Sequence, residues 1–162
     1  MLRPAPEPRP LEQFTRYTQR WQGIAELEPA AAFRTWTGEH EPPSHSMPPL
    51  AAGKAVLADF GRAAFDRFHL ALMRAYFTES RTISERGVIL DVAAAVGIDA
   101  EALAVTLDDR AADFEAAVVA DHREALSLGI AAVPTAVVNG EYMLQGAMSV
   151  EQYRRVVERL GG

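Results

Sequence analysis

The chain has 162 residues, of which 49% are hydrophobic, enough for one domain with a buried core. Its formal net charge is −6, so we expect no nucleic-acid partner. It contains no cysteine, which excludes disulfides, thiolate metal sites and thiol nucleophiles supplied by this chain. No apolar run is long enough to span a bilayer and no signal-peptide pattern opens the chain, so we expect a cytoplasmic protein without a membrane partner.

The N-terminal part of the chain predicts an extended arm followed by one helix. Four prolines alternate through residues 1–10, a pattern that favours extended and poorly ordered backbone. Residues 11–22 carry large apolar side chains at helical spacing, which predicts a helix. Residues 23–29 alternate weakly and suggest a short strand, whereas residues 30–46 have no clear period.

Residues 46–128 predict a run of helices. Ser46, Ser84 and Asp99 each precede an apolar pattern of helical period, so we expect them to be N-caps. Gly97 is expected just beyond the end of a helix, where a left-handed residue commonly stands. The expected helices begin near residues 46, 64, 84, 99 and 111.

Residues 129–146 predict a loop followed by a β-hairpin. Pro134 cannot donate to a sheet ladder, so we expect it at the start of a strand. Asn139 and Gly140 lie between two apolar runs and predict a type I′ turn, which needs positive φ at both central residues. Residues 149–152 match the capping-box pattern of a final helix. The buried stripe of that helix is expected to consist of Val150, Tyr153, Val157 and Leu160.

Four segments occur in an order and at spacings that are similar to those of one known family. They are residues 65–77, 82–99, 120–130 and 132–140. Together they resemble the DsbA-type branch of the thioredoxin superfamily, which includes FrnE-like proteins and, more distantly, kappa-class glutathione transferases and 2-hydroxychromene-2-carboxylate isomerases. The resemblance implies an α/β (mostly α) class: a thioredoxin-like fold with a DsbA-type helical insert at about residues 46–128. It also implies a single domain over residues 11–162 after a proline-rich arm at residues 1–10.

The same resemblance implies a binding site at Val133, Pro134 and Thr135. In that family the peptide bond before the loop proline is cis, and the preceding residue faces the active site. An extended peptide or glutathione can then pair with the loop as an added strand. The expected ligand is therefore an extended peptide or a small thiol compound, glutathione included, with no metal and no resident cofactor.

The catalytic half of the family's site has no counterpart in this sequence. In the family, a central strand leads into Cys-Pro-x-Cys, or a serine variant, at the start of the first helix, where the helix end lowers the pKa of the thiol. Residues 3–6, Arg-Pro-Ala-Pro, fall roughly at that place, so no catalytic residue can be carried over. We therefore expect the family's first strand to be missing or degenerate.

Three explanations of the missing strand stay open. The reading frame is incomplete or starts late, a partner or a swapped second copy supplies the strand, or the domain has become a helical protein with a small sheet. We rank a degenerate or truncated family member first. Three alternative functions are considered. The first is a DsbA-family thiol–disulfide oxidoreductase homologue that is inactive in redox chemistry. The others are a non-catalytic binding module that dimerises through an open sheet edge, and a glutathione-dependent isomerase or transferase.

Other chemistry-bearing residues favour structural roles. His69 lies on an apolar helix face and is expected to be a hydrogen-bonded core histidine, whereas His122 is expected to be partly exposed. His40 and His45 lie in a proline-rich loop without a clear third ligand, so no metal site is predicted. Trp21 and Trp36 are expected to be packing residues.

Overall fold

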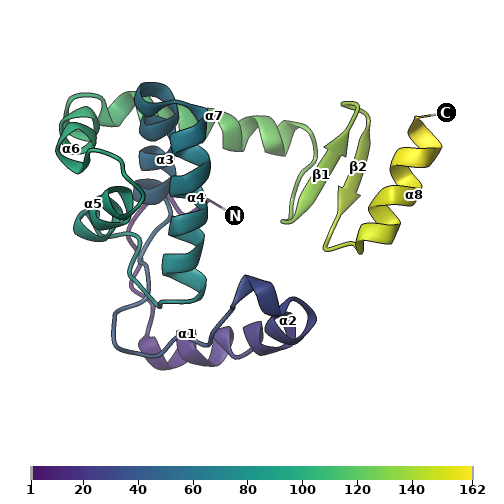
Figure 1. The fold of residues 1–162 in the computed structure, drawn as a ribbon, viewed down its shortest axis with the longest axis horizontal. Coiled ribbons are helices and arrows are strands. Elements are labelled where there is room, and N and C mark those ends of the chain that lie inside the picture. Colours follow the sequence, from purple (N-terminus) through teal and green to yellow (C-terminus); the bar gives the residue numbers. More distant parts are fainter. Residues whose placement is uncertain (1, 162) are drawn as a thin grey trace. The chain divides into compact units, whose positions relative to one another are not determined.

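The computed structural model describes residues 2–161, which form two compact units (Figure 1). We call residues 2–121 the helical unit and residues 122–161 the hairpin unit. The first contains α1 (Leu11–Thr18), α2 (Trp21–Leu27), the 3-10 turn η1 (Pro29–Ala31), α3 (Met47–Phe60), α4 (Arg62–Phe77), α5 (Arg86–Ala95), α6 (Ala100–Asp109) and most of α7 (Ala111–Ser127). The second contains the end of α7, β1 (Thr135–Val138), β2 (Tyr142–Gln145) and α8 (Val150–Leu160).

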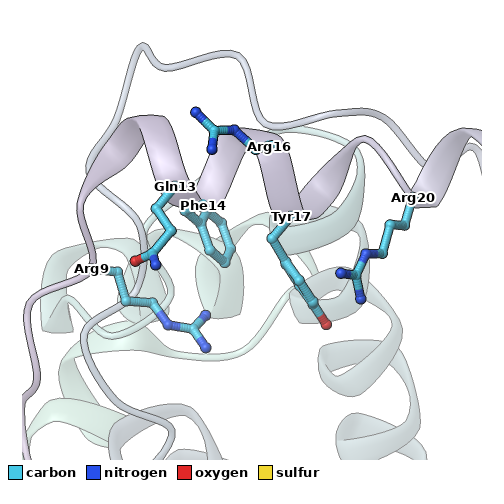
Figure 2. A pocket seen from close by; sticks show the side chains of 6 residues that line it. All are labelled: Arg9, Gln13, Phe14, Arg16, Tyr17 and Arg20. Carbon is cyan, nitrogen blue, oxygen red and sulfur yellow. The ribbon is translucent and has the colours of Figure 1, made fainter.

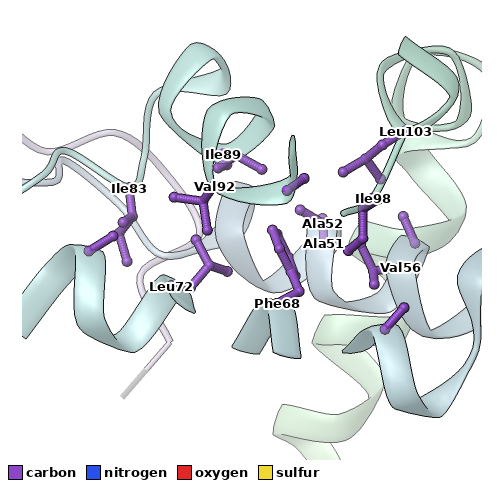
Figure 3. Close-up of a cluster of buried hydrophobic side chains, with 14 of the residues drawn as sticks. Ala51, Ala52, Val56, Phe68, Leu72, Ile83, Ile89, Val92, Ile98 and Leu103 are labelled. Carbon is purple, nitrogen blue, oxygen red and sulfur yellow. The ribbon is translucent and has the colours of Figure 1, made fainter. Parts of the chain in front are cut away.

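Helices α3 to α7 enclose the main core of the helical unit (Figure 3). Ala52 and Ala55 of α3 are fully buried at 0% exposure, and these small side chains let α4 pack closely against α3. Phe68 of α4 and Leu103 of α6 are also fully buried. Burying a side chain such as Phe68 stabilises the fold by about 1.5–3 kcal/mol. No helix within residues 2–161 has the length and apolar character needed to cross a membrane.

A second core, made of aromatic side chains, joins α1 to the end of α4. The Phe14 ring lies 5.2 Å from the Trp36 ring and 6.4 Å from the Tyr76 ring, centre to centre. The Trp21 ring lies 4.9 Å from the Phe77 ring. Both tryptophans are buried, which confirms that they are packing residues. The Phe14–Trp36 pair is edge to face, an arrangement that adds about 0.5–1.5 kcal/mol beyond burial.

The short strand expected at residues 23–29 is wrong. Trp21–Leu27 form α2, and η1 follows directly. The segment contains Ala, Glu and Leu, which are good helix formers. Its weak alternation is too short to favour a strand over a helix whose first residue, Trp21, is anchored in the aromatic core.

Residues 32–46 form an irregular segment that side-chain hydroxyls hold in place. The buried Thr18 hydroxyl accepts a hydrogen bond from the Trp36 N–H at 3.0 Å and donates to the Thr15 C=O at 2.9 Å. Three further hydroxyls bond its backbone: Ser80 accepts from the Thr37 N–H, Thr82 donates to the Glu41 C=O, and Ser84 accepts from the Ser44 N–H. These bonds replace the backbone ladder that an irregular segment lacks.

The proline-rich arm is extended, as expected, but it is tied to the irregular segment. The Arg3 N–H donates to the Ser46 hydroxyl at 2.9 Å, and the Arg3 C=O accepts from the Ser46 N–H at 2.9 Å. The Glu7 N–H donates to the Ser44 C=O at 3.1 Å. These bonds give the backbone of the described part of the arm partners in the irregular segment.

The structure confirms the predicted helix ends at Asp99 and Gly97 but not the predicted caps at Ser46 and Ser84. Asp99 caps α6 as predicted, accepting hydrogen bonds from two N–H groups of its first turn, both at 3.0 Å. Gly97 follows α5 with a φ of 78°, which confirms its predicted place. Ser46 and Ser84 make no side-chain cap, because their hydroxyls bond distant backbone instead.

In the hairpin unit, β1 and β2 pair antiparallel, with Val138 opposite Tyr142. Asn139 and Gly140 have φ of 55° and 74°, the positive values that a type I′ turn requires. The Glu141 N–H donates to the Val138 C=O at 3.2 Å and closes the turn. The predicted hairpin is therefore confirmed.

Helix α8 begins as predicted, but its apolar stripe does not become buried. The Ser149 hydroxyl accepts from the Gln152 N–H at 3.2 Å, and the Gln152 side chain accepts from the Ser149 N–H at 2.7 Å. The expected buried stripe is wrong, since Val150 is 74% exposed and Val157 is 61% exposed. No residue among 122–161 is buried, so local bonds rather than a core hold this unit together.

We expect Thr18→Val to destabilise the helical unit by about 1–3 kcal/mol, because the buried Trp36 N–H loses its acceptor while the side-chain shape is kept. Thr15→Val is the matched control, since its side chain makes no hydrogen bond within residues 2–161, and it should change stability by less than about 0.5 kcal/mol. Urea unfolding followed by tryptophan fluorescence measures both. Equal losses for the two variants would contradict the role given to Thr18.

Candidate functional site

The loop that joins α7 to β1 starts from a well-defined helix end. Gly129 has a φ of 77°, a conformation that glycine adopts without strain. Its N–H donates to the Leu126 C=O at 2.9 Å, and the Ile130 N–H donates to the Ala125 C=O at 2.9 Å. These two bonds make a Schellman motif, which sets the direction in which residues 131–135 leave the helix.

Val133, Pro134 and Thr135 form the end of this loop. The Val133–Pro134 peptide bond is cis, and the Val133 side chain is 83% exposed. The Thr135 hydroxyl donates to the Ala132 C=O at 2.7 Å. The Pro134 C=O accepts from the Gly146 N–H at 2.8 Å, so the loop is fixed to both the preceding turn and the hairpin.

Strand β1 leaves one edge of the two-stranded sheet open. Pro134 bonds across the hairpin to Gly146, and in antiparallel pairs every second residue bonds to the partner strand. Val133, Thr135 and Val137 therefore direct their N–H and C=O groups away from β2. Within residues 2–161 the backbone of Val133 has no hydrogen-bond partner.

The chemistry available at Val133, Pro134 and Thr135 is hydrogen bonding and apolar contact. None of the three side chains is an acid, a base or a thiol, and the Thr135 hydroxyl is already bonded within the loop. A free strand edge of this kind can accept an extended ligand through main-chain hydrogen bonds.

Of the histidines considered from the sequence, His40, His45 and His69 belong to the helical unit and His122 belongs to the hairpin unit. His69 is exposed and stacks on Phe65 at 5.7 Å between ring centres, so the expectation of a core histidine is wrong. The buried stripe of α4 lies to one side of it. His122 is partly exposed, as expected. Within residues 2–161 no group of three His, Asp or Glu side chains could hold a metal ion, and this includes His40 and His45.

The sequence-based predictions missed a hollow on the surface of α1 (Figure 2). It has a volume of about 460 Å³ and is lined by Arg9, Gln13, Phe14, Arg16, Tyr17 and Arg20. We call it the arginine hollow. Gln13, Tyr17 and Arg20 follow helical spacing, so the sequence already carried the signal of one helix face. Arg9, two residues before α1, lies at the same place.

Tyr76 lies in the aromatic core close to Arg9. Burial raises the pKa of Tyr76 above its ordinary value of 10.0, and the positive charge of Arg9 opposes the shift without cancelling it. Tyr76 therefore stays neutral under physiological conditions and serves as a packing residue.

The comparisons with known proteins agree on the fold. The family model described as a DSBA-like thioredoxin domain matches residues 42–158. A search of curated protein sequences gave no match. A solved structure of the cytosolic disulfide reductase DsbM from Pseudomonas aeruginosa with GSH is similar, with a TM-score of 0.70 and 25% identity over 90% of this chain and 75% of that chain.

Two further structures support the same architecture. Another structure of DsbM from Pseudomonas aeruginosa has a TM-score of 0.72 and 24% identity, covering 94% of this chain and 78% of that chain. A candidate protein disulfide isomerase from Nitrosomonas europaea has a TM-score of 0.75 and 15% identity, covering 96% of this chain and 76% of that chain. The mostly α, DsbA-like thioredoxin fold expected from the sequence is thereby confirmed.

We expect stability to fall at alkaline pH through Tyr76. Because its folded pKa is above 10.0, the unfolded chain releases this proton first as the pH rises. The stability is fully present below pH 10.0 and is lost as the pH rises through the folded pKa. Urea unfolding at about pH 8 and about pH 11 should show a smaller alkaline loss for Tyr76→Phe than for the wild type.

Tyr142→Phe is the control for this experiment, because Tyr142 is 46% exposed on β2. This variant should keep the wild-type alkaline loss. An unchanged alkaline loss in Tyr76→Phe would show that burial of Tyr76 does not govern the pH dependence.

Proposed function

The chain belongs to the DSBA-like thioredoxin domain family, and from that premise we propose that it is a ligand-binding member without redox chemistry of its own. Its proposed ligand is an extended peptide or a small thiol compound such as glutathione, held at Val133, Pro134 and Thr135. Disulfide exchange requires an attacking thiolate, and the chain has no cysteine.

The open edge of β1 is the observation that carries this proposal. Val133, Thr135 and Val137 direct backbone donors and acceptors away from β2, and Val133 is 83% exposed. An extended ligand gains main-chain hydrogen bonds at such an edge, while its side chains alternate between the two faces.

The similarity to DsbM makes glutathione the first ligand to test, since one structure of that cytosolic disulfide reductase is described with GSH. The same similarity supports a cytoplasmic location for this protein. A glutathione-dependent isomerase or transferase is less well supported, because that activity needs a serine or similar group near the first helix. Residues 1–18 contain no serine.

A second candidate function is a dimerisation module in which the open edge of β1 pairs with a second copy of the chain. The observation that favours it is the lack of buried residues in the hairpin unit, residues 122–161. Val133, Val137, Val150 and Val157 are all exposed there. Exposed apolar side chains beside an unpaired strand edge are typical of surfaces that associate.

For the ligand site, we expect glutathione to shift the backbone amide signals of Val133, Thr135 and Val137 in two-dimensional NMR. S-methylglutathione should bind with an affinity within about twofold of that of glutathione, because the proposed binding forms no disulfide and does not need the free thiol. A tenfold loss of affinity, worth about 1.4 kcal/mol, would instead show that the thiol takes part in binding. Ala136 and Val138 are built-in controls, since their amides face β2 and should shift less. Saturating glutathione that leaves the first three amides unshifted would refute this site.

For the dimerisation module, we expect the wild type to sediment as a dimer and Val137→Lys as a monomer. A lysine on the edge strand opposes strand pairing through its charge. Val105→Lys is the matched control, because Val105 is 55% exposed on α6 in the helical unit, and this variant should stay dimeric. A wild type that is monomeric at all concentrations would exclude the module.

A further inference from the structure

The arginine hollow lies entirely within the helical unit and does not involve residues 133–135. Figure 2 shows Arg9 of the arm, Tyr17 of α1 and Arg20 of the turn between α1 and α2 extending toward the same side, with the Gln13 amide beside Arg9. Arg16 points to the other side of α1 in this view, and its guanidinium forms an ion pair with Glu12 at 2.9 Å.

Arg9 and Arg20 are held by aromatic side chains rather than by carboxylates, and the Arg9 guanidinium also hydrogen-bonds the Tyr76 hydroxyl. The Arg9 guanidinium carbon lies 4.9 Å from the centre of the Phe14 ring, and that of Arg20 lies 5.4 Å from the centre of the Tyr17 ring. Within residues 2–161 neither arginine takes part in an ion pair. A guanidinium that stacks on a ring keeps the N–H groups at its edge available for an anion.

The charge of the whole protein makes this local arrangement informative. The chain carries a net charge of −6, so an anion is repelled by most of its surface. Two arginines without carboxylate partners, beside a glutamine amide and a tyrosine hydroxyl, create a local positive region with several hydrogen-bond donors.

We propose that the arginine hollow binds a small organic dianion, with one anionic group at Arg9 and the other at Arg20. Gln13 lies beside Arg9 and Tyr17 lies between Arg9 and Arg20 (Figure 2), and both donate hydrogen bonds to the ligand. Each guanidinium presents a planar fork of N–H groups that matches a carboxylate or a phosphate.

The two guanidinium charges without carboxylate partners argue for a ligand with two anionic groups. The Phe14 and Tyr17 rings, on which the guanidinium groups stack, have centres 6.1 Å apart. A ligand with one negative charge would balance only one of the two guanidinium charges. Carboxylates and phosphates share the required chemistry, so the ligand carries two groups of either kind.

The test is an NMR titration of the full chain with inorganic pyrophosphate, glutarate and acetate at constant ionic strength. The side-chain Nε–H signals of Arg9 and Arg20 and the Gln13 amide signal report on the hollow. We expect pyrophosphate or glutarate to bind at least about tenfold more tightly than acetate, as a second charged hydrogen-bonding group requires. The tighter of the two identifies a phosphate or a carboxylate ligand.

Arg9→Gln and Arg20→Gln should each weaken this binding by about tenfold or more. Arg62→Gln is the matched control, because it removes the same charge far from the hollow. Tyr76, which lies close to Arg9, is near the end of α4, and Arg62 is at the start of that helix, about 20 Å away. It should change the affinity by less than about twofold. Circular dichroism checks that each variant is folded, and Arg20→Gln, an exposed position, keeps the test valid if Arg9→Gln unfolds.

Three outcomes would overturn the proposal. The first is that neither dianion binds saturably, and the second is that acetate binds as tightly as both dianions. The third is that the three arginine variants weaken binding equally. Because the glutathione titration reports on residues 133–137 and this one on α1, either proposal can fail while the other stands.

Discussion

The buried hydroxyl of Thr18 links the first helix to a segment that has no regular structure. It accepts from the Trp36 N–H and donates to the Thr15 C=O, so both its hydrogen-bonding functions are used. An unpaired buried N–H would cost about 1–3 kcal/mol, and an irregular segment has no ladder to offset that loss. With Trp36 fixed in this way, Phe14 and Tyr76 pack against it, and α1 is held in the position that exposes the arginine hollow.

The hairpin unit is stabilised by a different balance of forces. Its helix ends and its turn are closed by local hydrogen bonds at Gly129, Glu141 and Ser149, yet no residue among 122–161 is buried. Apolar burial is the main source of stability in most folds, so this unit keeps unusually little of it. The open edge of β1 and the exposed valines are direct consequences, and both proposed functions of this unit use them.

The family fold is present here without the thiols that serve its chemistry. A fold does not by itself imply an activity, because function depends on the groups that a site contains. The loop at residues 131–135 offers backbone hydrogen bonds, and the arginine hollow offers positive charge. Both arrangements suit binding, and the chain has no cysteine to take part in disulfide exchange.

The sequence by itself determined the features whose rules act over a few neighbouring residues. The cap at Asp99 and the turn at Gly140 were predictable because each depends on a local backbone conformation and its adjacent N–H groups. Tertiary structure alone decided that Ser46 bonds Arg3 instead of capping α3 and that His69 is exposed. A hydroxyl, a ring or a guanidinium takes the partner that folding brings within reach, and that partner can lie tens of residues away.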